Sequence, residues 1–345
     1  MNTLELFTTA RAMVAEGKGL LAMDESTGTC NRRFASLGIP QTAEARCAYR
    51  HLILTTPGLG DYISGVILYD ETIRQTDENG TPLLELAKRA GVIPGIKVDT
   101  GAKDLAGHPG EKVTEGLDNL RERLTEYAKM GLKFSKWRAV ITIGEGIPSL
   151  GCIEANAHAL ARYAALCQEA GLVPIVEPEV LMDGNHTLAQ CCAATEETLH
   201  VLFDELHAQR VLLESTILKP NMVLSGIDCP EQASVEEVAE TTIDVFRRTV
   251  PAAVPGIAFL SGGQPSELAS ARLNEMNRRY AGKLPWEVTF SFSRAIQQPA
   301  LELWRGNPEN VAAAQKALYH RARCNGLAHR GEYTAEVEQE AEVRA

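Results

Sequence analysis

The sequence predicts a single α/β domain built as a closed (β/α)8 TIM barrel. Eight short runs rich in Val, Ile and Leu recur along the 345 residues, and helix-length segments separate them. Strands of this composition that alternate with helices are typical of a parallel sheet buried on both faces. Most of the runs end in a charged residue, and the chemistry of such barrels lies at the carboxyl ends of their strands. We therefore expect an active site at one end of the barrel.

The expected strands share an apolar centre. In chain order they lie within GKGLLAMDES (17–26), DYISGVILYD (61–70), GVIPGIKVD (91–99), KFSKWRAVI (133–141), GLVPIVEPEV (171–180), RVLLESTILKPN (210–221), GIAFLSGG (256–263) and EVTFSFSRA (287–295). The intervals between them leave room for a strand, two loops and one or two helices per unit.

Helical periodicity precedes the first strand and separates the later ones. An amphipathic helix is expected over residues 3–17. The helices before the third, fourth and fifth strands end at Gly91, Gly131 and Gly171, and glycine is the preferred residue at a helix carboxyl cap. These glycines therefore mark where each helix gives way to the next strand.

The chain after the eighth strand divides into two parts. Residues 307–331 predict a closing helix with Pro308 in its first turn. Residues 332–345 are polar and mostly acidic and have no apolar periodicity. We expect residues 1–331 to form one barrel domain with an N-terminal helix, and 332–345 to form a mobile acidic C-terminal tail.

Composition and charge narrow the class of protein. The net charge of −11 argues against nonspecific binding to nucleic acid, which usually requires a basic face. No apolar run is long enough to predict a transmembrane helix, and the amino terminus does not resemble a signal peptide. The eight cysteines have no CxxC spacing, which indicates reduced thiols in a cytoplasmic protein. We expect no membrane and no nucleic acid among its partners.

The histidines give no indication of a metal site. None of the eight falls in an HExxH arrangement, and most lie in expected helices or loops. His186 is the one tempting ligand, and we interpret it as structural. The sequence therefore predicts neither a metal nor a cofactor.

Three consecutive strands carry charged pairs with a spacing of two residues. Residues two apart on a strand face the same side, about 6.5 Å apart. The pairs are Lys97 with Asp99, Lys136 with Arg138, and Glu177 with Glu179. A salt-bridge network explains any one pair, but three adjacent pairs at strand ends favour an active site.

The sixth strand ends in Ile-Leu-Lys-Pro-Asn, with Lys219 before Pro220. Proline lacks an amide hydrogen and keeps the preceding residue extended, so Lys219 is expected to project from the strand end. A lysine amine attacks a carbonyl only when it is neutral, which desolvation and nearby cations favour. We favour Lys219 as an imine-forming lysine, although by chemistry alone Lys97 and Lys136 are rivals.

The seventh and eighth strands end in FLSGGQ and SFSRA, where barrels often bind phosphate. Gly262 and Gly263 allow backbone amides to approach an anion, and Ser261 adds a hydroxyl donor. Arg294 can add a charge-assisted contact to phosphate oxygens. These four residues predict a phosphate site.

The first strand ends in MDESTGTCNRR. Asp24 is expected to point a carboxylate into the mouth, where it can polarise a substrate hydroxyl. Thr29 and Arg33 are expected to meet a second phosphate on the opposite rim. Ser26 has an ordinary structural interpretation as the N-cap of the following helix.

With these motifs, the chain resembles class I fructose-bisphosphate aldolase, the metal-free type that works through a Schiff base. The resemblance is carried by LAMDESTGT, GIKVDTG, FSKWRAV, PIVEPEVLMDGNH, LLESTILKPNM, FLSGGQ and TFSFSRA, which together span most of the chain. It implies a (β/α)8 barrel, a phosphorylated sugar as substrate, no cofactor, and a homotetramer.

The resemblance also implies residue roles. Lys219 matches the imine-forming lysine, Glu177 the general acid and base, and Glu179 the glutamate that assists it. Lys136 and Arg138 match residues that hold the charged site together and contact substrate.

Further matches concern the open-chain sugar and its phosphates. Lys97 and Asp24 match residues that contact its hydroxyls. The remaining matches form the two phosphate pockets, with Ser261, Gly262 and Arg294 in one and Thr29 and Arg33 in the other. The implied reaction is reversible cleavage of fructose 1,6-bisphosphate to dihydroxyacetone phosphate and glyceraldehyde 3-phosphate.

The carboxyl end departs from the family. Many members end in a tyrosine whose tail folds over the site and protonates the enamine, whereas the last tyrosine here is Tyr333. The proton donor to the enamine is therefore left open. Three alternatives also stay open: use of sedoheptulose 1,7-bisphosphate, another Schiff-base barrel enzyme such as a transaldolase, and a noncatalytic phosphosugar-binding scaffold.

Overall fold

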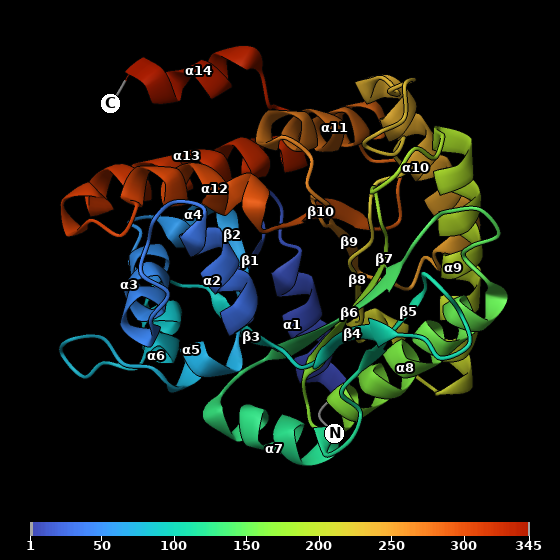
Figure 1. The fold of residues 1–345 in the computed structure, drawn as a ribbon, viewed down its shortest axis with the longest axis horizontal. Coiled ribbons are helices and arrows are strands. Elements are labelled where there is room, and N and C mark those ends of the chain that lie inside the picture. Colours follow the sequence, from blue (N-terminus) through green and yellow to red (C-terminus); the bar gives the residue numbers. More distant parts are fainter. Residues whose placement is uncertain (1–2, 344–345) are drawn as a thin grey trace.

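The computed structural model describes residues 3–343 of the chain, and eight parallel strands close into a barrel at its centre (Figure 1). The strands follow one another around the barrel in the order β1, β10, β9, β8, β7, β6, β3 and β2. Their bounds are β1 Gly19–Ala22, β2 Ile63–Leu68, β3 Ile93–Lys97, β6 Phe134–Ile141, β7 Val173–Val180, β8 Ile217–Leu218, β9 Gly256–Phe259 and β10 Glu287–Phe292. Each lies within one of the eight predicted runs, so the predicted TIM barrel is confirmed.

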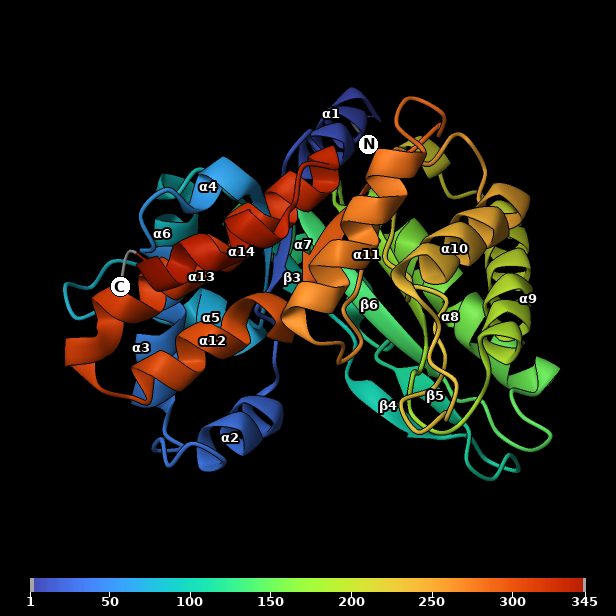
Figure 2. The ribbon, with the colours of Figure 1, turned by 90° about the horizontal axis from the view of Figure 1, so that it is seen from above.

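Helices surround the barrel (Figures 1 and 2). They are α1 Thr3–Met13, α2 Thr27–Ala35, α3 Ala43–Leu54, α4 Leu59–Tyr62, α5 Asp70–Arg74, α6 Leu83–Arg89, α7 Leu120–Met130, α8 Leu150–Glu169, α9 Leu188–Ala208, α10 Val235–Thr249, α11 Ser266–Arg279, α12 Arg294–Trp304, α13 Val311–Arg330 and α14 Ala335–Val343, with short 3-10 turns at Leu213–Ser215 and Pro308–Asn310. Gly91, Gly131 and Gly171 have φ angles of 74°, 92° and 82°, as their predicted place at helix ends requires. No helix within residues 3–343 combines the length and apolar character that a membrane crossing requires.

A two-stranded hairpin interrupts the βα alternation after β3. Its strands, β4 Gly101–Asp104 and β5 Lys112–Glu115, pair in antiparallel fashion. The sequence did not indicate them, because they are short, mostly exposed and without an apolar alternation. The hairpin begins directly after Asp99, whose side chain accepts a hydrogen bond of 3.1 Å from the Gly101 amide.

The interior of the barrel is filled by large side chains opposite small ones. Phe134 on β6 is fully buried, and its ring lies over Gly95 of the neighbouring strand β3. A Cβ atom at position 95 would lie 2.2 Å from that ring, so only glycine fits there. This packing brings the two strands that carry Lys97 and Lys136 together.

Helix α1 covers the amino-terminal end of the barrel. Its Met13 and the following Val14 are buried in one apolar cluster with Leu20 and Phe134 from the strands. The Ser64 hydroxyl on β2 donates to the Met13 carbonyl oxygen at 2.5 Å. Because α1 occupies this end, the polar mouth formed by the carboxyl ends of the strands lies at the opposite end.

The segment after α13 differs from the expected mobile tail. Its central part forms helix α14, which lies on α13 outside the barrel (Figure 2). The Glu338 carboxylate of α14 pairs with Arg321 of α13 and accepts a hydrogen bond of 2.6 Å from the Tyr333 hydroxyl. Arg323 pairs with Glu340 at 2.6 Å. The sequence did not predict this helix, because ion pairs with α13 hold it in place and apolar periodicity cannot reveal such pairs.

The contact of Glu338 predicts how α14 responds to pH. Burial alone would raise the pKa of Glu338, but hydrogen bonds from His320, Tyr333 and Arg321 outweigh it and lower the pKa from 4.5 to about 2. The stabilisation is therefore present above pH 4.5 and lost as the pH falls toward 2. We expect E338Q to lower the free energy of unfolding by about 1.5 kcal/mol at pH 7.

Urea unfolding at several pH values measures this effect. The difference between E338Q and the parent protein should shrink as the pH falls from 5 toward 3. E332Q, at an exposed position shortly before the helix, is the control and should change little. A difference that stays constant with pH would contradict the role of the Glu338 carboxylate.

Candidate active site

Four charged side chains from four strand ends meet in the mouth of the barrel. The Lys219 Nζ lies 3.2 Å from the Glu177 Oε1, and the Glu177 Oε2 lies 3.1 Å from the Lys136 Nζ. The Lys136 Nζ also lies 2.8 Å from the Asp24 Oδ2. The exposed fractions of the Lys219, Glu177 and Lys136 side chains are only 4% each. The amines of Lys219 and Lys136 thus alternate with the Glu177 carboxylate across the neighbouring strands β8, β7 and β6. Asp24 reaches Lys136 from the end of β1.

The electrostatics of the mouth keep its central carboxylate ionised. Burial alone would raise the pKa of Glu177, but Lys136, Lys219 and Arg138 outweigh it and hold the pKa below its usual value. Burial would likewise lower the pKa of Lys136, yet Asp24 and Glu177 raise it well above the usual range. Lys136 is therefore a fixed cation between two carboxylates.

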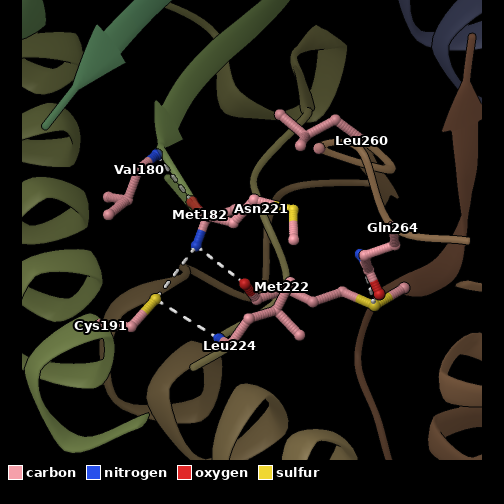
Figure 3. Close-up of a pocket in the computed structure, with 9 residues that line it drawn as sticks. Val180, Met182, Cys191, Asn221, Met222, Leu224, Leu260 and Gln264 are labelled. Atoms are coloured by element: carbon pink, nitrogen blue, oxygen red, sulfur yellow. Dashed lines mark hydrogen bonds between the residues drawn. The ribbon is translucent and has the colours of Figure 1, made fainter. Parts of the chain in front are cut away.

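The position of Lys219 follows from the end of a very short strand. Its amide donates to the Val176 carbonyl oxygen of β7 at 2.8 Å, and Pro220 then ends the ladder. Asn221 turns away from the mouth, and its Oδ1 accepts a hydrogen bond of 3.0 Å from the Val180 amide (Figure 3). The amide group of Asn221 therefore joins the ends of β7 and β8, which carry Glu177 and Lys219. Asn221 has no role among the residues predicted from the sequence, although its place directly after Lys-Pro was a usable signal.

A second layer of ion pairs lies beside this group. The Lys97 Nζ lies 2.7 Å from the Asp99 Oδ1, and Arg138 pairs with Glu179. Asp99 also accepts a hydrogen bond of 3.2 Å from the Arg138 amide through its other oxygen. Asp99 thus links β3 to β6 and orients Lys97, so it is a positioning residue that the charged spacing indicated only as a partner.

The predicted phosphate turn follows β9. Gly262 and Gly263 have φ angles of 60° and 99°, in the left-handed region that favours glycine. A Cβ atom at position 263 would lie 2.9 Å from the Arg294 Nη2, so the arginine rests directly against the turn. Ser261 is buried at the start of the turn, and Arg294 is exposed at the end of β10. Four predicted residues therefore lie together and offer donors to an anion.

Arg33 is placed differently from the expectation. The prediction put it with Thr29 on the rim opposite Arg294, but its Nη2 lies 3.4 Å from the Ser293 hydroxyl, next to Arg294. The closure of the barrel makes β1 a neighbour of β10, and this brings α2 to the same side. The Thr29 hydroxyl on α2 accepts a hydrogen bond of 3.1 Å from Arg32. The two predicted phosphate-binding sites therefore lie next to each other, where Arg33 is close to Arg294.

Glu25 holds Arg33 in this place. The Glu25 Oε1 lies 2.5 Å from Arg33 and accepts hydrogen bonds of 3.0 Å each from Ser293 and Gln297. The other oxygen, Oε2, lies 2.7 Å from the buried Arg50. Ser26 caps α2 as predicted. Local sequence could not reveal this network, because its members lie up to 272 residues apart.

One group of metal-ligating atoms lies outside the mouth. Among the described residues, His320, Cys324 and Glu338 bring such atoms within 4.8 Å of one another. Glu338 already contacts Arg321 and Tyr333 there, and a guanidinium at the same oxygen repels a cation. The group is therefore an anchor for α14. His186 is buried.

The arrangement in the mouth suits covalent chemistry on a carbonyl. It offers a buried amine beside a buried carboxylate, with an anion-binding turn nearby. A model of the family "Fructose-bisphosphate aldolase class-I" matches residues 5–345. The chain belongs to this family.

Individual relatives cover nearly the whole chain. It is 59% identical to a probable fructose-bisphosphate aldolase class 1 of Xanthomonas axonopodis pv. citri, over 96% of this chain and 99% of the relative. It is 50% identical to fructose-bisphosphate aldolase 1 of Toxoplasma gondii, over 95% and 91%. The solved structure of the Plasmodium falciparum aldolase, in complex with TRAP and an inhibitor, superimposes with a TM-score of 0.94 at 46% identity and covers 96% of both chains.

Membership of the class I aldolase family sets the meaning of the site. A lysine imine is general to class I aldolases, and the mouth offers three buried or half-buried lysines for that role: Lys97, Lys136 and Lys219. Lys136 contacts two carboxylates, and Lys97 is held by both the carboxylate and the backbone carbonyl oxygen of Asp99. Lys219 has one ion pair, with Glu177, and its side chain is more deeply buried than that of Lys97. The geometry thus favours Lys219 among the alternatives that the sequence left open.

Proposed function

We propose that the protein cleaves fructose 1,6-bisphosphate reversibly through an imine on Lys219, giving dihydroxyacetone phosphate and glyceraldehyde 3-phosphate. The observation that carries this proposal is the 3.2 Å contact between the Lys219 amine and the Glu177 carboxylate in a buried mouth. Membership of the aldolase family supports the same reaction. No metal or cofactor is part of the proposal.

The first half of the reaction forms the imine. The Lys219 ammonium gives a proton to the Glu177 carboxylate, and the neutral amine adds to the ketone carbon at position 2 of the open-chain sugar. A proton of the adduct's nitrogen moves to the former carbonyl oxygen, which becomes a hydroxyl. Glu177 then gives a proton to that hydroxyl, which leaves as water. This role fits its surroundings, because conversion of the ammonium of Lys219 to a neutral adduct removes one of the cations that lower the pKa of Glu177. The carboxyl group therefore becomes a better proton carrier once the adduct has formed.

The second half breaks the bond between carbons 3 and 4. The iminium accepts the electron pair of that bond. One of the two carboxylates that contact Lys136, either Asp24 or Glu177, takes the proton of the hydroxyl on carbon 4. Glyceraldehyde 3-phosphate leaves, the enamine gains a proton, and hydrolysis frees Lys219 and dihydroxyacetone phosphate. Lys97 is proposed to contact the sugar hydroxyls, and Arg138 with Glu179 to hold the charged wall of the site.

The two phosphates of the sugar are proposed to bind at two neighbouring sets of residues in the mouth. One contacts Ser261, Gly262, Gly263 and Arg294, and the other contacts Thr29 and Arg33. Burial, Arg33 and Arg138 lower the pKa of Arg294 below its usual value, with Glu179 acting against them. A dianion between these arginines relieves their mutual repulsion.

Reduction with borohydride tests the proposal. Sodium borohydride added with dihydroxyacetone phosphate should inactivate the protein irreversibly and add the mass of the reduced ligand to the peptide that contains Lys219. Label on Lys97 or Lys136 would assign the imine elsewhere. Activity that survives reduction but disappears with a chelator would instead indicate a metal-dependent aldolase.

Removal of the tail tests whether α14 takes part in the reaction. A protein cut after Tyr333 loses α14 but keeps the barrel, and we expect it to retain cleavage within about threefold, because α14 lies on α13 outside the barrel. Steady-state cleavage of fructose 1,6-bisphosphate measures this. A large loss of turnover would show that the tail donates a proton or closes the site.

We further propose a cytoplasmic homotetramer. Eight free cysteines support a reducing compartment, and relatives from Arabidopsis thaliana carry the word cytosolic in their names. Light scattering after size exclusion measures the assembly directly. A monomer at micromolar concentration would contradict the tetramer without affecting the chemistry.

One other substrate and two other functions are tested by the same assay. Sedoheptulose 1,7-bisphosphate offers the same ketone and two phosphates, so turnover on the two bisphosphates should be compared. A transaldolase or a noncatalytic scaffold would not split either sugar into dihydroxyacetone phosphate and an aldose phosphate, and the same assay separates them.

A further inference from the structure

Arg272 on helix α11 is a buried cation without an acidic partner. Its exposed fraction is 6%. Its Nη1 donates to the Gln264 Oε1 at 2.8 Å, and its Nε has no hydrogen-bond partner. Among the side chains of residues 3–340, no carboxylate forms an ion pair with it. An arginine in this state is costly for the folded protein, because buried charges are normally paired.

Through Gln264, Arg272 contacts the turn that is predicted to bind phosphate. Gln264 is the last residue of that turn, and its amide donates to the Ser261 carbonyl oxygen at 3.0 Å. Its side chain points beneath the turn toward Met222 (Figure 3). A small cavity lined mainly by apolar side chains, among them Leu260 and Met222, lies under the same turn. Arg272 therefore contacts the side chain of the last residue of the turn, and both residues are buried from bulk water.

We propose that Arg272 is a positioning residue whose buried positive charge strengthens the binding of a phosphate group at the turn Ser261–Gln264. This inference rests on the proposed function, in which that turn holds one phosphate of the substrate. The phosphate is the counter-charge that the ligand-free protein lacks. Arg272 does not touch the phosphate and acts through Gln264 and through its field.

Three physical arguments support this role. The attraction between two charges grows as the surrounding dielectric constant falls, so a buried arginine such as Arg272 acts more strongly than one in water. The amino end of α11, which follows the turn, adds a positive potential of the same sign. Burial lowers the pKa of Arg272 only to about 10, so the side chain remains charged near neutral pH.

The role predicts an unusual combination of effects. R272M removes a buried, uncompensated charge, so its melting temperature should equal or exceed that of the parent protein. The same change should raise the inhibition constant of inorganic phosphate and the KM for fructose 1,6-bisphosphate about tenfold, with a much smaller effect on kcat. A merely structural arginine would instead lower the melting temperature and leave phosphate binding unchanged.

Two further variants make the test specific. R272K keeps the charge and should bind inorganic phosphate within about threefold of the parent protein. R279M, on the same helix but in an exposed ion pair with Glu240, is the matched control and should change neither property. Unchanged phosphate inhibition in R272M would overturn the inference, and so would weakening that R272K does not rescue.

The proposed function is checked separately in the same preparations. Each variant is reduced with borohydride in the presence of dihydroxyacetone phosphate, and label on Lys219 is measured. Absence of label in the parent protein would refute the reaction itself. Normal label together with normal phosphate inhibition in R272M would refute only the role of Arg272.

Discussion

K219A is expected to abolish sugar cleavage, with turnover at least about 10 000-fold lower than in the parent protein. Alanine cannot form the imine, and water alone cannot provide the electron sink on which cleavage of the carbon–carbon bond depends. The fold should persist, because Glu177 keeps its contact with Lys136 after the amine is lost. Single-turnover cleavage of fructose 1,6-bisphosphate measures the loss, and circular dichroism verifies the fold.

Two controls accompany this variant. K133A removes an exposed lysine that pairs with Glu5, far from the mouth, and should retain full turnover. Inorganic phosphate should still protect K219A against thermal unfolding, because the turn after β9 is untouched. If K219A split the sugar at the original rate, the assignment of the nucleophile would be wrong.

E177Q is expected to lower turnover by about 100- to 10 000-fold. The amide can still accept a hydrogen bond from Lys219, but it cannot carry a proton to the departing hydroxyl. The adduct should therefore lose water slowly, and borohydride should label Lys219 more slowly than in the parent protein. Rapid-quench measurement of labelling separates this step from sugar binding.

E179Q is the comparison for E177Q. Glu179 lies two residues along the same strand and pairs with Arg138, not with Lys219. Its loss should reduce turnover less and should affect the KM more, because Arg138 would no longer be held. Equal losses in the two variants, with equal rates of labelling, would contradict the assignment of proton transfer to Glu177.

Much of the fold could be predicted because a short stretch of sequence is enough to indicate each strand. A buried parallel strand requires an apolar run such as ISGVIL, and a helix end requires a residue such as Gly131. The alternation of charges in the mouth could also be predicted, since residues two apart share a face and neighbouring strands are parallel. Lys136, Glu177 and Lys219 therefore come together as the sequence indicates.

The remaining features depend on contacts between distant segments. Arg33 lies beside Ser293 because the barrel closes between β1 and β10, and no local pattern encodes that distance. Glu338 is recognised only once α14 lies on α13. Arg272 looks like an ordinary helix-surface arginine in sequence, because its burial depends on the turn that precedes the helix.

The placement of α1 has a practical consequence for attaching this protein to a support. The helix begins the described chain and covers the end of the barrel opposite Lys219. A linker fused to the amino terminus would therefore leave from the closed end and hold the open end toward the surrounding solution. Immobilised in this way, the catalyst should keep its access for dissolved sugars, whereas coupling through surface lysines would orient it at random.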